Sequence, residues 1–411
     1  MHVSIFLHDE MVVEKMDKIF CRAQELKEET IFNRRYLHQN PELGLALPVT
    51  SAFVHEKLKA MGYQVKRLGS SGLTVLAGKA GAGKTILLRA DMDALPMREE
   101  SSLEFAAQNE ISHCCGHDLH TAMLLTAAKI IKEQEDRLMG QVKFLFQPGE
   151  ETADGALEMI SEGILNDPKP DSVLAMHVNA KAPLGKLDYG RGIAFCSNDN
   201  LEIIIKGEGG HGARPHEARD PLKTAIHLYQ ALQTIRTGDI SPMEPIILTI
   251  TVINGGSTYN VIPDEVIMKG TLRTYDEGAQ NKVLERIREI CQNIGSAFNN
   301  EINIELKDKL LPLYCTPAFT DEILIYCREI LGADKVSAVN EIKMGSEDFS
   351  FISSKYPAAS GYLFIGAGPD DESCYPYGQH SPKVIYNEAV LPLGAAVMAG
   401  SAIKWLQNNG G

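Results

Sequence analysis

Apolar runs of strand length alternate with helical patterns through the first 190 residues, and this alternation constrains the fold more than any other feature of the chain. Residues 86–93, 141–146 and 172–178 have the composition of buried strands, and a helical pattern follows residue 121. Alternating strands and helices favour parallel pairing, because each helix crosses over the sheet between strands. We therefore predict an α/β fold in which a mostly parallel sheet is sandwiched by helices.

The order of elements changes near residue 190. Strand patterns at 200–206, 246–252, 266–271 and 301–306 are interrupted by helical patterns at 220–236 and 281–298. This β-α-β-β-α-β order predicts a small ferredoxin-like α+β insert. The first alternation resumes after Pro312. We expect one catalytic domain in two parts, residues 1–190 and 309–411, interrupted by an inserted domain at residues 191–308.

Composition excludes some partners and suggests a compartment. A net charge of −14 disfavours nucleic acid, which binds basic surfaces. No apolar run reaches the roughly 18 residues that a membrane helix needs. Residues 1–10 lack the basic start and apolar core of a signal peptide. Eight cysteines in 411 residues do not resemble a disulfide scaffold. We expect a cytoplasmic protein that binds neither nucleic acid nor membrane.

Residues 112–122 hold three histidines, two cysteines and an aspartate where a loop enters a helical pattern. Cys115 and His117 are two positions apart, so an extended backbone would direct both side chains to one side. A thiolate and an imidazole suit a borderline-soft divalent metal. The alternative for this stretch alone is a buried polar turn with a reduced cysteine pair.

Acidic residues and one histidine follow the predicted strands. Asp91 and Asp93 end the first strand, Glu150 and Glu151 follow the second, and His177 lies near the end of the third. Carboxylates at strand ends line the ligand crevice of α/β sheets. Of two adjacent glutamates, one can bind a metal while the other transfers protons. Taken singly, a capping turn is a credible alternative for one of the two aspartates. An acidic turn is slightly favoured for the glutamates alone, and a structural role is favoured for His177 alone.

Residues 78–85 match the phosphate-binding pattern G-x-x-x-x-G-K-T. That motif requires a helix beginning at its Lys-Thr pair. Strand patterns lie on both sides here, so we interpret the glycines as a hairpin turn between two strands. A nucleotide-binding protein is therefore a disfavoured alternative.

Nine motifs together resemble the di-metal amidohydrolase and peptidase family of aminoacylases, hippurate hydrolases, glutamate-releasing carboxypeptidases and plant auxin-conjugate hydrolases, above all its cysteine-containing branch. They span nearly the whole chain in the family's order. They are Arg-Ala-Asp-Met-Asp-Ala-Leu-Pro (89–96), Cys-Gly-His-Asp-Leu-His-Thr-Ala-Met (115–123), Gln-Pro-Gly-Glu-Glu (147–151), His177, Gly-His-Gly-Ala-Arg-Pro-His (210–216), Asn-Val-Ile-Pro (260–263), Gly-Thr-Leu-Arg-Thr (270–274), Met-Gly-Ser-Glu-Asp-Phe (344–349) and His-Ser-Pro (380–382).

The resemblance implies a site for two divalent ions, zinc or manganese first, with nickel or cobalt as further candidates. Cys115 would bridge the ions, with His117 and His177 completing one coordination shell. The other shell would be completed by Glu151 and His380. One thiolate, one carboxylate and three imidazoles nearly fill two tetrahedral shells and leave room for water.

The resemblance also implies roles for residues around the ions. Glu150 would act as general base and acid. Three residues would orient the ligands: Asp93, Asp118 and His120.

In the family the insert is a lid that forms a homodimer. His211 would reach the partner subunit's site and stabilise the oxyanion, while Arg273 and Asn260 would hold a substrate carboxylate. The alternative for His211 is a glycine-rich turn whose histidine caps the helix at Asp220.

The expected activity is hydrolysis of the amide bond of N-acyl amino acids or related dipeptide-like substrates. A non-catalytic metal-binding protein on the same fold is the alternative, and the presence of Glu150 disfavours it.

Two positions depart from the family. Residues 177–183 lack the usual aromatic side chains, which leaves acyl preference open, and Cys114 adds a second oxidisable thiol.

Overall fold

The computed structural model describes residues 18–81, 83–338, 344–369 and 375–410. The chain forms two compact units, which are described separately. Unit 1 comprises residues 1–194, 314–341 and 351–411, and unit 2 comprises residues 195–313 and 342–350. The domain ends at 190 and 308 stay a prediction. The N-terminal stretch used to exclude a signal peptide lies outside the described residues.

Unit 1 is built on an eight-stranded mixed sheet in the order β1-β2-β4-β3-β5-β16-β6-β15. Strands β4, β3, β5 and β16 run parallel, and the antiparallel pairings are β1–β2, β2–β4 and β16–β6. The strands are β1 (Lys66–Leu68), β2 (Gly72–Ala77), β3 (Thr85–Asp91), β4 (Gln141–Gln147), β5 (Ser172–Asn179), β6 (Leu187–Tyr189), β15 (Val336–Ala338) and β16 (Ser360–Gly366). Strands β3, β4 and β16 are buried along their whole length, which explains their continuous apolar runs.

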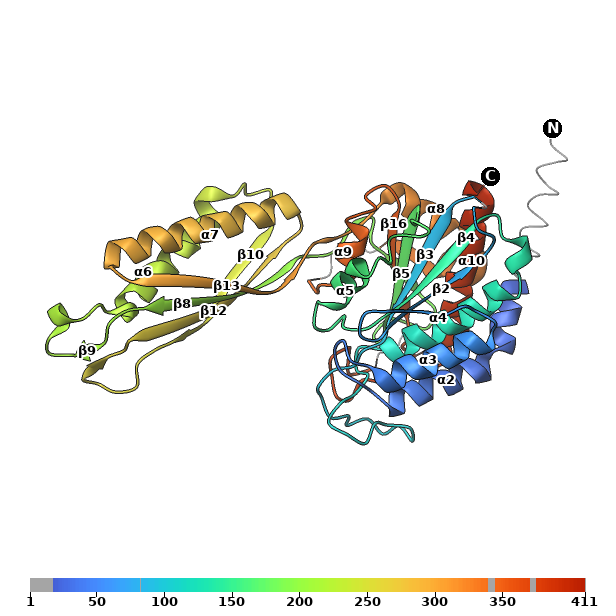
Figure 1. Ribbon diagram of the computed structural model, residues 1–411, viewed down its shortest axis with the longest axis horizontal. Coiled ribbons are helices and arrows are strands. Elements are labelled where there is room, and N and C mark those ends of the chain that lie inside the picture. Colours follow the sequence, from blue (N-terminus) through green and yellow to red (C-terminus); the bar gives the residue numbers. More distant parts are fainter. Residues whose placement is uncertain (1–17, 82, 339–343, 370–374, 411) are drawn as a thin grey trace. The chain divides into compact units, whose positions relative to one another are not determined.

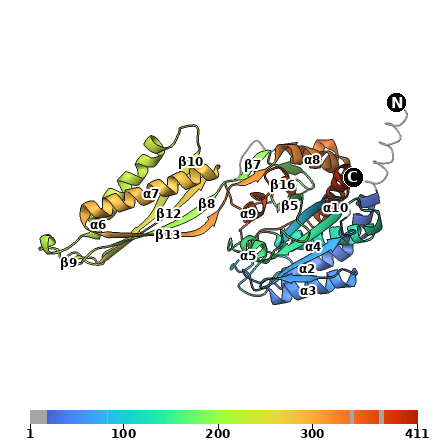
Figure 2. The same ribbon diagram turned by 45° about the horizontal axis from the view of Figure 1, so that its top comes forward.

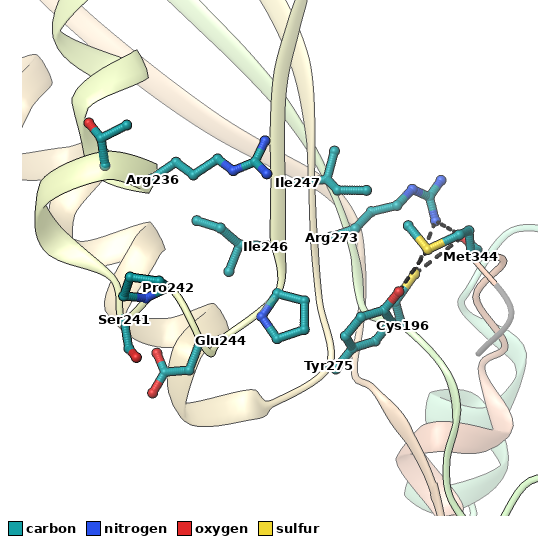
Figure 3. Close-up of a pocket in the computed structure, with 12 residues that line it drawn as sticks. Cys196, Arg236, Ser241, Pro242, Glu244, Ile246, Ile247, Arg273, Tyr275 and Met344 are labelled. Atoms are coloured by element: carbon teal, nitrogen blue, oxygen red, sulfur yellow. Dashed lines mark hydrogen bonds between the residues drawn. The ribbon is translucent and has the colours of Figure 1, made fainter. Parts of the chain in front are cut away.

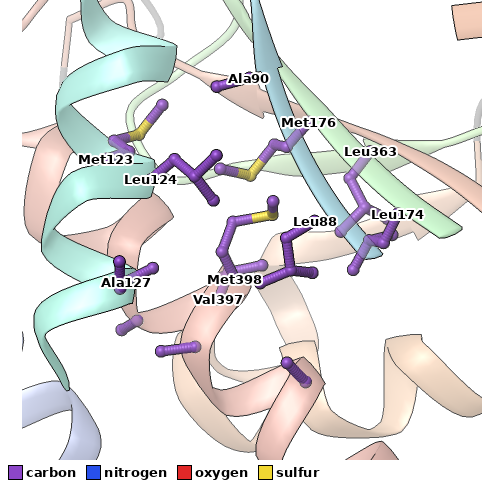
Figure 4. Close-up of a cluster of buried hydrophobic side chains, with 14 of the residues drawn as sticks. Leu88, Ala90, Met123, Leu124, Ala127, Leu174, Met176, Leu363, Val397 and Met398 are labelled. Atoms are coloured by element: carbon purple, nitrogen blue, oxygen red, sulfur yellow. The ribbon is translucent and has the colours of Figure 1, made fainter. Parts of the chain in front are cut away.

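Helices flank this sheet (Figures 1 and 2). They are α2 (Lys27–Gln39), α3 (Pro48–Ala60), α4 (His117–Lys132), α5 (Gly155–Ser161), α8 (Pro317–Leu331), α9 (Phe349–Ser353) and α10 (Val390–Asn409), with short 3-10 turns η1 (Glu135–Arg137) and η4 (Ala333–Lys335). Figure 4 shows α4 and α10 packing on the central strands. The side chains that meet there include Leu88, Leu124, Met176 and Met398. The expected α/β sandwich is therefore confirmed.

Helix α10 is long and apolar enough to cross a membrane by length and composition alone. Of its most apolar 18-residue window, 89% is buried inside the protein. The position of α10 in the protein core explains its apolar sequence, because a helix that is buried on nearly all sides needs few polar side chains.

The glycines of residues 78–85 do not form the expected hairpin, and that prediction was wrong. Strand β4 lies between β2 and β3 and pairs with both of them. The connection crosses the start of β4, where the Gln141 amide donates to the Lys84 carbonyl at 2.9 Å. The same glycine-rich pattern occurs in a hairpin turn between neighbouring strands and in a segment that connects two strands across a third one between them. Strand β3 begins at Thr85, so the helix that a phosphate loop requires is absent there.

Unit 2 contains a four-stranded antiparallel sheet in the order β10-β12-β8-β13. Its elements are β8 (Asn198–Lys206), α6 (Pro221–Thr234), the π-helical turn η3 (Ile235–Asp239), β10 (Ile246–Asn254), β12 (Glu265–Thr274), α7 (Glu277–Phe298) and β13 (Glu301–Leu310). Strand β9 (Gly210–His211) pairs with β11 (Val261–Ile262), and η2 (Pro215–Glu217) follows β9. Two short strands whose residues belong mostly to unit 1, β7 (Gly192–Phe195) and β14 (Leu313–Cys315), pair with each other. The β-α-β-β-α-β connectivity is the expected ferredoxin-like arrangement, with an apolar core between sheet and helices.

A buried ion-pair network joins helix α2 to the first turn of α4. The Arg34 Nε and His38 Nδ1 each lie 2.8 Å from Asp118 Oδ2. Asp118 and Arg34 are almost fully buried, whereas Arg35, on the same helix, is largely exposed and pairs with Glu388. Burial raises the pKa of Asp118, but Arg34 and His38 outweigh it and hold this pKa below its usual value.

The two neighbouring arginines give a matched test of this network. We predict that Arg34→Met lowers the free energy of unfolding by about 3–5 kcal/mol, because it leaves a buried carboxylate without its main partner. Arg35→Met should lower it by less than about 1 kcal/mol, since that ion pair is exposed. Urea denaturation of the metal-free proteins measures both. Equal effects of the two substitutions would contradict this account.

Candidate metal centre

Four of the five candidate ligands lie at the ends of three neighbouring parallel strands or in the segments that follow them, and His380 follows strand β16. Strand β3 ends at Asp91, β4 runs into Glu150 and Glu151, and β5 carries His177 near its end. Because β4, β3 and β5 are adjacent and parallel, these carboxyl ends meet at one edge of the sheet. That edge is where α/β sheets bind ligands.

Gly116 fixes the junction between the Cys115 loop and helix α4. It occupies the N-cap position with a left-handed φ of 95°. A Cβ atom there would lie 2.5 Å from Cγ2 of Val178. Only glycine tolerates both the conformation and this close approach. The junction places buried Cys115 just before the helix and buried His117 at its first residue.

The five expected ligands lie together in two groups that share Cys115. One group is Cys115, His117 and His177, and the other is Cys115, Glu151 and His380; within each, the ligand atoms lie within 4.8 Å of one another. Cys115 Sγ is 3.4 Å from His177 Nε2, and His380 Nε2 is 3.6 Å from Glu151 Oε1. Ligands of one tetrahedral zinc ion lie about 3.3–3.8 Å apart. The spacing therefore suits two ions with a common thiolate, and metal binding itself stays a prediction.

The polar atoms of this cluster also fit a cation. Among the described residues, neither ring nitrogen of buried His117 makes a hydrogen bond, nor does Oε1 of Glu151. Asp93 Oδ1 lies 3.4 Å from His117 Nδ1, within ion-pair range. His177 Nδ1 lies 2.7 Å from the Val178 carbonyl oxygen and donates to it, so its Nε2 carries a lone pair facing Cys115. Buried polar atoms without partners are costly, and a metal ion would satisfy them.

Negative charge accumulates around the cluster. Burial first, and then the carboxylates of Glu151 and Glu150, raise the pKa of the Cys115 thiol well above its usual value. Burial likewise raises the pKa of Glu151. Burial lowers the pKa of His117, but nearby carboxylates led by Asp91 outweigh it and raise this pKa to about 10. Nearby carboxylates thus add to the burial of Cys115 and outweigh the burial of His117, and divalent cations would neutralise this negative charge.

Asp93 and His120 contact the segments that carry the ligands, as the resemblance implied. The Asp93 carboxylate accepts the backbone amides of Glu150 and Glu151, each at 3.0 Å. His120 Nδ1 donates to Asp91 Oδ1 at 2.6 Å, and its Nε2 accepts the Val178 amide at 2.9 Å. Asp91, which the sequence also singled out, thus fixes the His120 ring.

Asp118 lies on the side of helix α4 that faces helix α2, and its role in orienting a ligand stays a prediction. Its carboxylate bonds to Arg34 and His38 on helix α2 and not to a candidate ligand. It therefore anchors the helix that begins with His117, which is an indirect way of orienting that ligand.

Glu150 lies beside the cluster. It is half-buried, and its carboxylate forms a further close group with those of Glu151 and the ring of His117. Its backbone amide donates to the Asp93 carboxylate. A carboxylate in this place can reach a proton on a molecule bound at the cluster.

His211 and Asn260 lie together in unit 2, on strand β9 and just before β11. The Gly212 amide donates to the Asn260 carbonyl at 2.8 Å. His211 is exposed, and its Nδ1 accepts the Ala213 amide at 3.0 Å, which leaves the proton on Nε2. The alternative role for His211 is wrong, because Asp220 itself caps α6 by accepting the Leu222 amide.

Arg273 lies on strand β12 of the four-stranded sheet, whereas His211 and Asn260 lie at the separate β9–β11 pair. Arg273 is eight positions after Glu265, the first residue of β12. Eight residues of extended strand span about 27 Å. The segment that carries Asn260 precedes the end of β12 that is far from Arg273, and the joint role of the two residues in holding a substrate carboxylate stays a prediction.

A cavity of about 580 Å³ lies beside Arg273 within unit 2 (Figure 3). Arg273 Nη1 donates to the Met344 carbonyl at 2.9 Å, and Cys196 and Tyr275 also contact Met344. Arg236, from η3, lines the same cavity. Two guanidinium groups at one cavity suit an anionic ligand.

Sequence reasoning missed two side chains that contact the ligand loops. The Tyr386 hydroxyl donates to the Cys114 carbonyl at 3.0 Å. The Gln379 side-chain amide donates to the Val178 carbonyl at 2.7 Å. The position of Gln379 next to His380 was the one available signal, since its partner is 201 residues away in the chain.

The sequence matches the profile of Peptidase family M20/M25/M40 over residues 87–404, and the chain belongs to this family. Its family and its named relatives identify the chain as a hydrolase that acts on amide bonds.

Named relatives cover almost the whole chain. Thermostable carboxypeptidase 2 of Saccharolobus solfataricus is 34% identical over 400 residues, covering 96% of this chain and 99% of the relative. N-acetyl-L-cysteine deacetylase of Bacillus subtilis is 34% identical, covering 93% and 90%. Hippurate hydrolase of Campylobacter jejuni is 32% identical, covering 91% and 96%.

Solved structures agree with the fold. A dinuclear metal binding peptidase of the M20 family from Bacillus subtilis superposes with a TM-score of 0.76 at 26% identity, covering 93% of this chain and 99% of that chain. A structure from methicillin-resistant Staphylococcus aureus gives a TM-score of 0.87 at 30% identity, covering 95% and 99%.

Proposed function

We propose that this chain uses two divalent ions to hydrolyse the amide bond of N-acyl amino acids or related dipeptide-like substrates. The observation that carries the proposal is the pair of ligand groups sharing Cys115, with Glu150 beside them. Relatives named as a hippurate hydrolase and an N-acetyl-L-cysteine deacetylase support the substrate class.

The proposed ligands are Cys115 for both ions, His117 and His177 for one, and Glu151 and His380 for the other. Zinc and manganese are the ions proposed for this mixed ligand set, with nickel and cobalt next. Affinity alone does not fix the choice, because site geometry and the supply of each metal in the cell decide which ion is bound. When bound, the ions would polarise the amide carbonyl and lower the pKa of a water molecule.

Glu150 is the proposed proton-transfer group. It accepts a proton from the attacking water and delivers it to the nitrogen of the leaving amine, so the products are a carboxylic acid and a free amino group. Asp93 supports this role, since it holds the backbone amides of Glu150 and Glu151.

His211 is the proposed donor to the developing oxyanion, supplied by a partner subunit. Its protonated Nε2 is suited to donating a hydrogen bond. We propose that Arg273 of one subunit and Asn260 of its partner hold the substrate carboxylate. The length of β12 between Arg273 and the strand end that follows Asn260, about 27 Å, supports this division.

A homodimer through unit 2 is part of this proposal. Strand β10 is an edge of the four-stranded sheet, so one side of its backbone has no neighbouring strand among the described residues. Its side chains Ile247, Val252 and Ile253 are exposed. Pairing two β10 edges across a two-fold axis would cover these apolar groups.

We expect two metal ions per subunit in protein purified without chelator or affinity tag. Elemental analysis with a metal-reconstitution titration measures this stoichiometry. Removing the metal should abolish hydrolysis, and adding two equivalents should restore it, because the ligand set is built for two ions. Full activity with less than one ion per subunit would contradict the two-metal proposal.

We expect Glu150→Gln to lower kcat about 10²–10⁴-fold, the usual contribution of a positioned general base. Substrate affinity and metal content should persist, because Glu150 is not among the proposed ligands. The matched control is Glu162→Gln, an exposed glutamate after helix α5, which should leave kcat unchanged. If Glu150→Gln retains more than about a tenth of kcat, the base lies elsewhere.

Mixed dimers test whether His211 acts in the partner's site. Glu150→Gln and His211→Ala proteins are each purified with low activity and then mixed under exchanging conditions. Random exchange makes half the dimers mixed, with one of two sites complete, so about a quarter of wild-type activity should return. Mixing either variant with itself is the control. No recovery after exchange verified by mass would place His211 in its own subunit's site or outside catalysis.

Acyl and amine preferences are measured by varying each part of an N-acyl amino acid separately. We expect substrates with a free α-carboxylate to be preferred, because a guanidinium binds that group bidentately. Arg273→Lys should raise KM for these substrates more than it lowers kcat. A protein that binds two ions but hydrolyses none of the substrates would favour the non-catalytic alternative.

A further inference from the structure

His380 reaches the cluster from an unusual backbone position. Its φ is 63°, a left-handed conformation that non-glycine residues rarely adopt. Its side chain is 57% exposed, so surrounding contacts do little to hold the ring in place. Something other than local packing must keep its Nε2 within 3.6 Å of Glu151.

Two hydrogen bonds hold the segment around His380 to other ligand-bearing segments. The His380 backbone amide donates to the Cys114 carbonyl at 3.1 Å, next to the shared ligand Cys115. The Gln379 side-chain amide donates to the Val178 carbonyl at 2.7 Å, at the end of strand β5.

The Val178 carbonyl serves both halves of the cluster. It also accepts the Nδ1 proton of His177 at 2.7 Å, the bond that directs His177 Nε2 towards Cys115. One main-chain oxygen thus fixes the imidazole of one ligand group and, through Gln379, the backbone that carries His380 in the other.

We propose that Gln379 is a positioning residue that sets His380 and thereby supports the metal subsite of Cys115, Glu151 and His380. The proposal rests on the proposed metal function. Gln379 touches neither an ion nor the substrate; it acts by holding the left-handed backbone at His380 against the end of β5. The Val178 oxygen already binds His177, so loss of Gln379 should affect the His380 subsite selectively.

The test substitution is Gln379→Met, which keeps side-chain length and removes the amide donor. Titration of metal-free protein with Zn²⁺ against a chromophoric chelator should show one of the two ions binding about 10–100-fold less tightly, as is usual when a supporting hydrogen bond to a ligand is lost. The other ion should change less than about threefold. Gln108→Met is the matched control, because that exposed amide also donates to a main-chain carbonyl, Ala106, and should change neither ion.

A double-mutant comparison identifies the route of the effect. His380→Ala should leave one ion, and adding Gln379→Met to it should not weaken that ion further, because the Gln379 effect passes through His380. Additional weakening in the double variant would overturn the proposal.

A second readout needs no metal. Hydrogen exchange of the metal-free protein should be at least about tenfold faster at the His380 amide in Gln379→Met, because the strained segment loses a tether, while the urea midpoint stays unchanged. Unchanged exchange, or a general loss of stability with both ions weakened equally, would refute a positioning role. If wild-type protein binds no metal, the proposed function fails, while this exchange measurement still decides whether Gln379 holds His380.

Discussion

The accumulation of buried negative charge around one thiol is the interaction on which the rest of the site depends. Cys115 belongs to both ligand groups, and the carboxylates beside it raise the pKa of its thiol. Such a cluster is unfavourable without cations, so the surrounding structure must hold it together. That support comes from Gly116, from the Asp93 carboxylate, and from the Asp118 anchor to helix α2.

Much of this arrangement could be predicted from the chain because it depends on local patterns. Continuous apolar runs identified the buried strands, and the change to β-α-β-β-α-β order identified the ferredoxin-like insert. Acidic residues and a histidine at strand ends identified the edge where the ligands meet. The family's motif order then grouped Cys115 with its partners as the structure does.

The features that the sequence did not reveal depend on contacts between distant segments. The glycines before Thr85 predicted a hairpin, but β4, from some 60 residues later, inserts between the two strands. The one signal for Gln379 was its place next to His380, because its partner is a main-chain carbonyl 201 residues away. The place of Arg273 near the far end of β12 depends on where that strand begins and ends, which motif spacing does not encode.

The central claim is that one thiolate binds two ions, and X-ray absorption of the zinc-loaded protein measures this directly. The account predicts one sulfur neighbour at about 2.3 Å for each zinc, and a second zinc at about 3.5 Å. The sulfur signal should disappear in Cys115→Ser, because Cys115 is the only sulfur among the proposed ligands. A shell of nitrogen and oxygen alone, or a sulfur signal that survives in Cys115→Ser, would contradict it.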